Sequence, residues 1–222
     1  ALPMATPERS RADGADRNAE CERCHQAEAQ AWRSSRHREA FSNAEFQRAY
    51  LVEPASFCRD CHAPESAAFP SAANDALGVG CISCHQAGEA VISSQRHGLE
   101  RGLPAHRLER NAEFGGSGAC RACHEFSFGD DARREQPLLM QRTASEHAAS
   151  GATQSCSDCH MQGGSHSFAS TREASAHQRA VEVEASPLSA SGLRLTLRTR
   201  DVGHAYPTGD LFRRVRVVAE AV

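Results

Sequence analysis

One short pattern, Cys-x-x-Cys-His, occurs five times in this chain of 222 residues and uses all ten cysteines. The five copies are Cys21, Cys24, His25; Cys58, Cys61, His62; Cys81, Cys84, His85; Cys120, Cys123, His124; and Cys156, Cys159, His160. Histidine makes up only 12 of the 222 residues, so its place after every cysteine pair is not a chance arrangement. The motif therefore constrains the fold more than any other feature of the sequence.

The spacing within each motif suits covalent attachment of haem. Two thiols three positions apart can form thioethers with the two vinyl groups of one porphyrin, and the next imidazole can then bind the iron axially. Two CxxC pairs can also build a four-thiolate zinc site, but zinc gives no reason for a histidine after each pair, and five pairs is an odd number. Disulfides within CxxC belong mainly to redox enzymes. The sequence predicts five covalently bound haem c groups.

The chain is too short to bury a side-chain core around each of five haems. All five motifs lie between Cys21 and His160, which leaves roughly 28 residues for each. Aromatic residues make up only 5% of the sequence, so a conventional core would be thin. We expect a mainly helical and irregular body that wraps closely packed haems, followed by a small antiparallel β region at the C-terminus.

Residue patterns give a coarse map of helices and strands. The similar stretches 21–40 and 81–100 are rich in good helix formers, and a further helix is expected over Gln136–Ala149. From residue 181 apolar and polar residues alternate, which predicts strands at Val181–Glu184, Leu193–Arg198 and Val215–Val217. We expect a pentahaem domain over residues 1–178 and a β-rich region over 179–222, whose sheet is completed by a partner chain or by further sequence.

The motifs and the segments between them resemble the multihaem c-type cytochromes, especially the lineage of the small tetrahaem carrier that serves hydroxylamine oxidation in nitrifiers. The resemblance lies in Trp32 and His37, Ala63-Pro64, Gly78-Val79-Gly80, Cys120–Phe126, Met140–His147, Cys156–Met161, His166-Ser167-Phe168 and Val202–Asp210. It implies a haem-wrapped helical body, electron transfer, and a periplasmic or extracellular location for an exported bacterial protein. The polar first residues, Ala1 to Pro7, are typical of a mature N-terminus after removal of a signal peptide, or of a shortened chain. The chain departs from the tetrahaem carrier in its fifth motif and its β-rich tail.

Seven histidines lie outside the motifs, which is enough to give all five irons a second imidazole. The expected distal ligands are His37, His97, His106, His147, His166 and His204. His177 is expected to be a surface residue, and a methionine ligand is the minor alternative.

The leading function is electron conduction between redox partners through mostly bis-histidine haems, without catalysis. The alternatives are a multihaem oxidoreductase with one open haem acting on a small nitrogen compound, or a subunit of a polymeric cytochrome wire or of a larger electron-transfer complex. All 25 basic side chains are arginine, which excludes lysine chemistry. The net charge of −3 argues against a nucleic-acid partner, and no apolar run has the length of a membrane span.

The haems would make the protein more acidic. Ten propionates add ten negative charges and five ferric centres return five positive ones, which takes the net charge from −3 to −8, or to −13 after full reduction. We therefore expect a redox partner with a basic docking patch.

Overall fold

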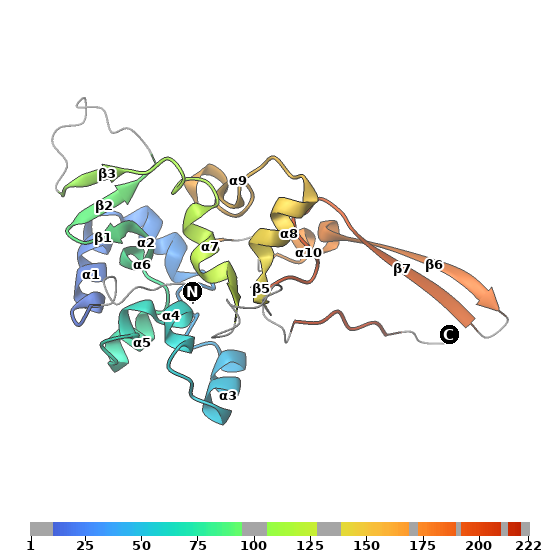
Figure 1. The fold of residues 1–222 in the computed structure, drawn as a ribbon, viewed down its shortest axis with the longest axis horizontal. Helices are drawn as coiled ribbons and strands as arrows, with labels where there is room; N and C mark the ends of the chain where they lie inside the picture. The colour runs from blue at the N-terminus through green and yellow to red at the C-terminus, as the bar shows by residue number, and fades with distance from the viewer. Residues whose placement is uncertain are drawn as a thin grey trace. The chain divides into compact units, whose positions relative to one another are not determined.

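A computed structural model describes residues 11–94, 106–127, 139–168, 173–189, 192–209 and 213–218 (Figure 1). The chain divides into two compact units. The N-terminal unit consists of Pro3–Cys123 and Ser155–Thr171, and the C-terminal unit consists mainly of His124–Gln154 and Arg172–Val222. The expected division into residues 1–178 and 179–222 stays a proposal.

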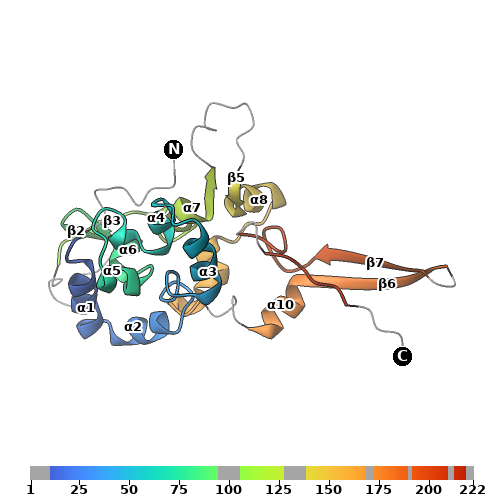
Figure 2. The same cartoon turned by 90° about the horizontal axis from the view of Figure 1, so that it is seen from below.

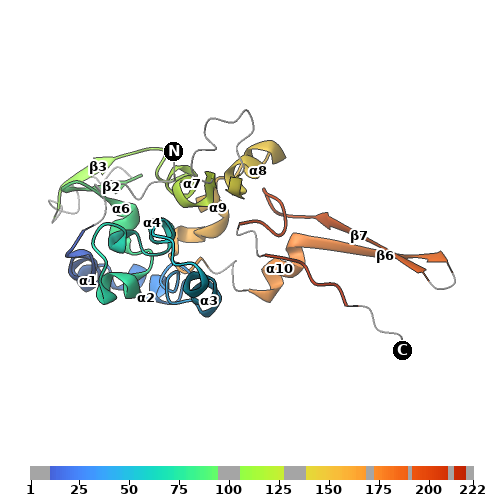
Figure 3. The same ribbon diagram turned by 60° about the horizontal axis from the view of Figure 1, so that its bottom comes forward.

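Short helices dominate the N-terminal unit. They are α1 (Gly14–Cys24), α2 (Gln26–Arg33), α3 (Ala44–Val52), α4 (Cys58–His62), η1 (Pro64–Ser66), α5 (Ala72–Leu77), α6 (Cys81–His85), α9 (Cys156–His160) and η4 (Gln162–Gly164). Helix α7 (Gly118–His124) contains the fourth motif, and the first segment of this unit ends within it at Cys123. Helix α1 contacts α2, α5 and α6, and α1, α2 and α6 can be followed in Figure 3.

Local side-chain contacts explain where several of these helices begin. The Asn43 carboxamide oxygen accepts hydrogen bonds from the Glu45 and Phe46 amides at the start of α3. At the start of α9, the Ser155 hydroxyl accepts from the Asp158 amide while the Asp158 carboxylate accepts from the Ser155 amide. Such caps satisfy backbone donors that a helix leaves unpaired at its first turn. They fix the position at which the fifth motif begins.

The helix expected after the third motif is wrong over residues 86–93, and residues 95–100 lie outside the described part of the chain. The chain forms β1 (Gln86–Ala87) and β2 (Ala90–Ser93), which pair antiparallel, and β2 pairs in parallel with β3 (Leu108–Arg110). Gly88 adopts a positive φ of 58° between β1 and β2, a conformation that ends a helix and favours a turn. Val91 and Ile92 then follow with β-branched side chains that favour strands. The expected helix after the first motif is confirmed as α2.

The described residues of the C-terminal unit form two antiparallel strand pairs and two helices. Its elements are β4 (Glu125–Ser127), β5 (Leu139–Arg142), α8 (Thr143–Ser150), α10 (Ala174–Ala180), β6 (Val181–Ser189) and β7 (Gly192–Thr199). The β6–β7 hairpin confirms the two strands expected there (Figure 2). The Glu125 carboxylate accepts hydrogen bonds from the amide and hydroxyl of Ser145, which joins β4 to the first turn of α8.

Two expected elements of the C-terminal unit differ from the structure. Within the expected helix Gln136–Ala149, residues 139–142 form strand β5, because pairing with β4 overrides the local helix propensity; residues 136–138 lie outside the described part of the chain. The expected strand at Val215–Val217 is also wrong, since described residues 213–218 form no strand and are exposed. An alternating pattern makes a strand only where a neighbouring strand supplies hydrogen bonds.

The side-chain core is thin, as the composition indicates. Its buried apolar members among the described residues are Ala29, Trp32, Ala63, Leu77, Ile82, Ala90, Ile92, Phe126 and Ala180. Buried polar side chains accompany them, with Asn18 and Glu65 both 0% exposed. The chain thus has the expected fold class, which is mostly helical and irregular with small sheets.

Candidate functional site

Each of the five motifs lies at or near the end of a short helix. Helices α4, α6 and α9 consist of one motif each, α7 ends on His124, and α1 ends on Cys24 with His25 directly after it. Residues three positions apart on a helix share a face, so the two thiols of a motif point the same way. None of the ten cysteines forms a disulfide. The thiols are therefore arranged for attachment of one group by each pair.

The first and third motifs are held together by one buried amide side chain. Asn18, on the turn of α1 before Cys21, accepts a hydrogen bond from the Cys81 amide at 2.7 Å and donates to the Glu22 carboxylate at 2.8 Å. A Cβ on Gly80 would lie 2.5 Å from the Asn18 oxygen, so only glycine permits this approach. These contacts join α1 to the start of α6.

The segment that carries His37 is attached to the same place. The Val79 amide donates to the His37 carbonyl at 2.9 Å, and the Val79 carbonyl accepts from the Trp32 indole at 2.8 Å. Gly78 has a φ of 66°, and a Cβ there would lie 2.5 Å from the His37 carbonyl oxygen. The Gly78-Val79-Gly80 sequence thus brings the region of His37 against the third motif.

The fourth and fifth motifs are joined in a similar way. The Cys156 amide donates to the Ser117 hydroxyl at 3.2 Å, and the Ser157 hydroxyl donates to the Gly115 carbonyl. The pKa of the Cys120 thiol is raised, mainly by a hydrogen bond with Cys156 and secondly by burial. The first cysteines of these two motifs are therefore in contact.

Thiol pKa values report further neighbours across motifs. Burial, together with the nearby Cys21, raises the pKa of Cys81 to about 12. Cys84 acts in the same direction on Cys120. The pKa values of Cys21, Cys58 and Cys159 are also raised by burial. Cysteines of the first and third, third and fourth, and fourth and fifth motifs are thus near neighbours, and these thiols are protonated at neutral pH.

Two motif histidines are oriented by backbone carbonyls. His85 Nδ1 lies 3.0 Å from the Ile92 carbonyl oxygen, and His62 Nδ1 lies 2.8 Å from that of Ala40. Burial also lowers the pKa of His85, which favours its neutral form. A neutral imidazole held through one nitrogen presents the other one to a metal.

Two ring pairs have the spacing that axial coordination requires. The His85 and His166 centroids lie 6.1 Å apart, and those of His25 and His106 lie 6.4 Å apart. Since a metal–imidazole bond is about 2 Å long, two imidazoles on opposite sides of one iron have centroids roughly 6 Å apart. His166 Nδ1 is buried without a hydrogen-bond partner among the described residues, which is typical of a site for a group the chain itself does not supply. The residues present fit a haem at this position.

The other predicted ligands have the following contacts. His37 packs edge-on against Phe168 with centroids 4.3 Å apart. In the C-terminal unit, His147 Nε2 lies 2.9 Å from the Gln154 carbonyl and His204 Nδ1 lies 2.9 Å from the Ala205 carbonyl. A Cβ on Gly203 would lie 2.8 Å from His147 Cδ2, so the loop before His204 packs on α8. His97 lies outside the described residues.

Some residues that build this region had no signal in the sequence. Asn18, Ser117 and Glu65 are ordinary polar residues in the chain, yet each contacts a cysteine motif. His177, expected on the surface, has its Nδ1 3.1 Å from the Tyr206 hydroxyl.

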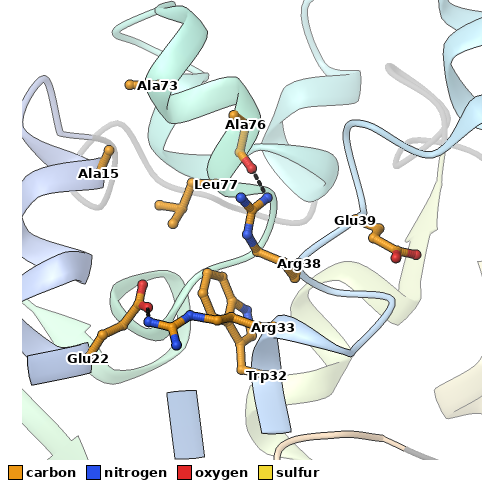
Figure 4. Close-up of a pocket in the computed structure, with 9 residues that line it drawn as sticks. All are labelled: Ala15, Glu22, Trp32, Arg33, Arg38, Glu39, Ala73, Ala76 and Leu77. Atoms are coloured by element: carbon orange, nitrogen blue, oxygen red, sulfur yellow. Dashed lines mark hydrogen bonds and ion pairs between the residues drawn. The ribbon is translucent and has the colours of Figure 1, made fainter. Parts of the chain in front are cut away.

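A cavity of about 530 Å³ lies beside the first motif (Figure 4). Trp32 forms one wall, and the Arg38 guanidinium lies 5.5 Å from its ring centroid while donating to the Ala76 carbonyl. Arg33 forms an ion pair with Glu22 at the same cavity. The cavity therefore presents arginines and an aromatic face between α1, α2 and α5.

Comparisons with known proteins agree with this arrangement. The family described as cytochrome c554 and c-prime matches residues 20–86, which contain the first three motifs. A crystal structure of a penta-heme cytochrome c552 from Thermochromatium tepidum matches with a TM-score of 0.67 and 21% identity, over 86% of this chain and 67% of that one. The resemblance to multihaem c-type cytochromes is thereby confirmed. No match is found among curated protein sequences.

The family match and the shared fold support covalently bound haem c and, in general terms, electron transfer. Within the described ranges, no group of three or more histidine, cysteine, aspartate or glutamate side chains is placed to hold a single metal ion. Among the same residues, no helix is long and apolar enough to cross a membrane.

Proposed function

We propose that this protein conducts electrons between redox partners through five covalently bound haem c groups, most of them with two histidine ligands. The observation that carries the proposal is the closeness of different motifs. Asn18 of α1 joins the first motif to the Cys81 amide of the third, and Ser117 joins the fourth motif to the Cys156 amide of the fifth. Cys120 and Cys156 share a hydrogen bond, and Cys84 lies near enough to Cys120 to raise its pKa. Groups attached at these cysteines would lie close enough for electrons to pass from one to the next.

We assign one haem to the His85 and His166 pair and another to the His25 and His106 pair, on the basis of their ring separations. His37, His97, His147 and His204 are proposed as the source of the other distal ligands. Two imidazoles on one iron leave no open position, so such a centre changes its charge without binding a substrate.

The chain contributes orientation and exclusion of water. Haem iron supplies reversible one-electron transfer when bound. The Ile92 carbonyl holds the His85 ring through Nδ1, which keeps the ring orientation the same in both oxidation states. The burial that raises the pKa of Cys81 and the burial of His166 Nδ1 would keep polar solvent away from these positions, which lowers the reorganisation that each electron transfer requires.

The location and partners follow from the cofactor and the charge. Covalent haem c is attached after export, so we propose a periplasmic or extracellular location. The proposed net charge of −8 in the oxidised state favours a donor or acceptor with a basic docking surface.

Self-association or membership of a larger complex is a further proposal, because the β6–β7 hairpin exposes Val183, Leu193 and Leu197 at 57%, 54% and 39%. The register places Val183 opposite Leu197, so these residues belong to one apolar face of a two-stranded sheet. Such a sheet is only marginally stable alone.

Mass spectrometry of the denatured protein tests the number of haems. We expect the mass of the chain plus five haems, and a Cys81→Ala/Cys84→Ala variant should retain four. Bound zinc, or haem that acid acetone extracts, would contradict the proposal.

A further inference from the structure

Glu65 is a carboxylic acid placed inside the protein between two haem-attachment motifs. It lies in η1, three residues after His62, and its side chain is 0% exposed. Its Oε1 accepts a hydrogen bond from the Ser83 hydroxyl at 3.2 Å, and Ser83 lies between Cys81 and Cys84. The acid therefore touches the helix turn that carries the thiols of the third motif.

The surrounding elements leave little room for water. A Cβ on Gly14 would lie 2.8 Å from Glu65 Cβ and 3.0 Å from its Cγ, so α1 packs directly on this side chain. Asn74 of α5 donates to the Glu65 carbonyl at 3.2 Å and accepts from the Ala15 amide at 3.0 Å. An ionised carboxylate in such a place is costly unless nearby groups compensate its charge.

Residues before α1 also act on this carboxyl group, and a backbone hydrogen bond from Arg11 lowers its pKa. Arg11 and Asp13, before α1, act in opposite directions, and Arg11 bonds to Asp13 at 3.2 Å while reaching Glu89 at 3.8 Å. Burial raises the pKa of Glu65 to about 7, although the hydrogen bond from Ser83 lowers it.

Helices α4 and α5, which contact η1, carry further charged side chains. Arg59 of α4 pairs with Asp75 of α5 at 3.1 Å. Asp60 of α4 has its own pKa raised by burial. From α6, the neutral Ser83 hydroxyl donates to Glu65. Because Glu65 is buried against the third motif, a new charge at that motif would act on its carboxyl group through a medium that screens charge poorly.

We propose that Glu65 is a proton-binding site coupled to reduction of the haem held by Cys81, Cys84 and His85. This inference rests on the proposed function, because it requires a haem at the third motif. When that centre gains one electron from a redox partner, Glu65 takes one proton from solvent and forms an O–H bond at a carboxylate oxygen. On oxidation the electron leaves to the acceptor and the proton returns to solvent, so the local net charge stays constant.

Redox titration of the holoprotein between about pH 5 and 9 tests this coupling. The midpoint potential of one haem should fall as pH rises. The equilibrium constant for reduction of that haem should decrease by at most tenfold per pH unit. Glu65→Gln, which keeps the size and a hydrogen-bonding group, should abolish this component. Glu28→Gln removes the same charge at an exposed position of α2 and should keep it. An unchanged pH dependence in Glu65→Gln would overturn the proposal.

Infrared difference spectroscopy of the wild-type protein gives a test that needs no variant. Reduction at about pH 7 should produce a carboxylic-acid C=O band, and Glu65→Gln should lack it if that variant binds all five haems. Ser83→Ala removes the donor that stabilises the ionised form, so its pH-dependent range should move to higher pH. Absence of the band in wild-type protein with five haems overturns the coupling, whereas fewer than five haems by mass contradicts the proposed function instead.

Discussion

At the scale of single residues, the two members of each histidine pair differ in how well the sequence could predict them. The motif histidines His25 and His85 follow from CxxCH directly. Their partners His106 and His166 were expected only as members of a set, because a sequence does not say which ring faces which. The ring separations of 6.4 and 6.1 Å supply that information. The role of Glu65 had no sequence signal, since it depends on burial by three helices.

We predict that His166→Ala opens one coordination position. About one fifth of the total iron should become high-spin while all five haems stay attached, because only one axial ligand is lost. Electron paramagnetic resonance of the ferric protein measures this fraction. His177→Ala is the matched control, since its ring contacts Tyr206 and should leave the spectrum unchanged. A low-spin spectrum in His166→Ala would remove His166 from the ligand set.

Glu65 should also make stability depend on pH. Its pKa is raised from 4.5 to about 7 in the folded protein, so the folded state binds more protons than the unfolded state between these values. Stability should therefore fall as pH rises through this range, by about 3 kcal/mol at most. Denaturant unfolding at pH values on both sides should show this fall in the wild type and a smaller one in Glu65→Gln. A parallel pH dependence in the two proteins would contradict the assignment.

At the scale of elements, the sequence predicted best where neighbouring residues decide the structure. Helix α2 and the β6–β7 hairpin were expected from composition and alternation. Strands β1 and β2 were expected as helix, although residues 81–100 resemble 21–40, because Gly88 and the pairing with β3 decide the outcome. The strand expected at Val215–Val217 failed for the opposite reason, since the described residues supply it no pairing strand.

Asn18 should be a main support of the contact between α1 and α6. Asn18→Ala leaves the Cys81 amide without its acceptor inside the protein, and we expect a loss of about 1–3 kcal/mol in the free energy of unfolding. Guanidinium unfolding followed by far-ultraviolet circular dichroism measures it. Asn111→Ala removes a similar pair of hydrogen bonds at an exposed turn and should cost less. Equal losses in the two variants would show that Asn18 has no special role.

At the scale of the whole molecule, the proposed function makes charge the main factor in encounters with redox partners. We expect the rate of association with a basic partner protein to fall steeply as salt is raised, because a chain with the five proposed haems would be acidic and salt screens surface fields. Stopped-flow electron transfer at several ionic strengths measures this dependence. A rate that salt leaves unchanged would contradict docking through a basic patch.

The proposed function depends most on whether every haem iron has two axial ligands. Electron paramagnetic resonance of the oxidised protein, together with carbon monoxide addition to the reduced protein, tests this directly. We predict only low-spin ferric signals and no carbon monoxide adduct, since bis-histidine iron has no open position. A high-spin signal that amounts to one haem, together with binding of one carbon monoxide by the reduced protein, would contradict a function limited to electron conduction. Such a result would favour an oxidoreductase with an open haem.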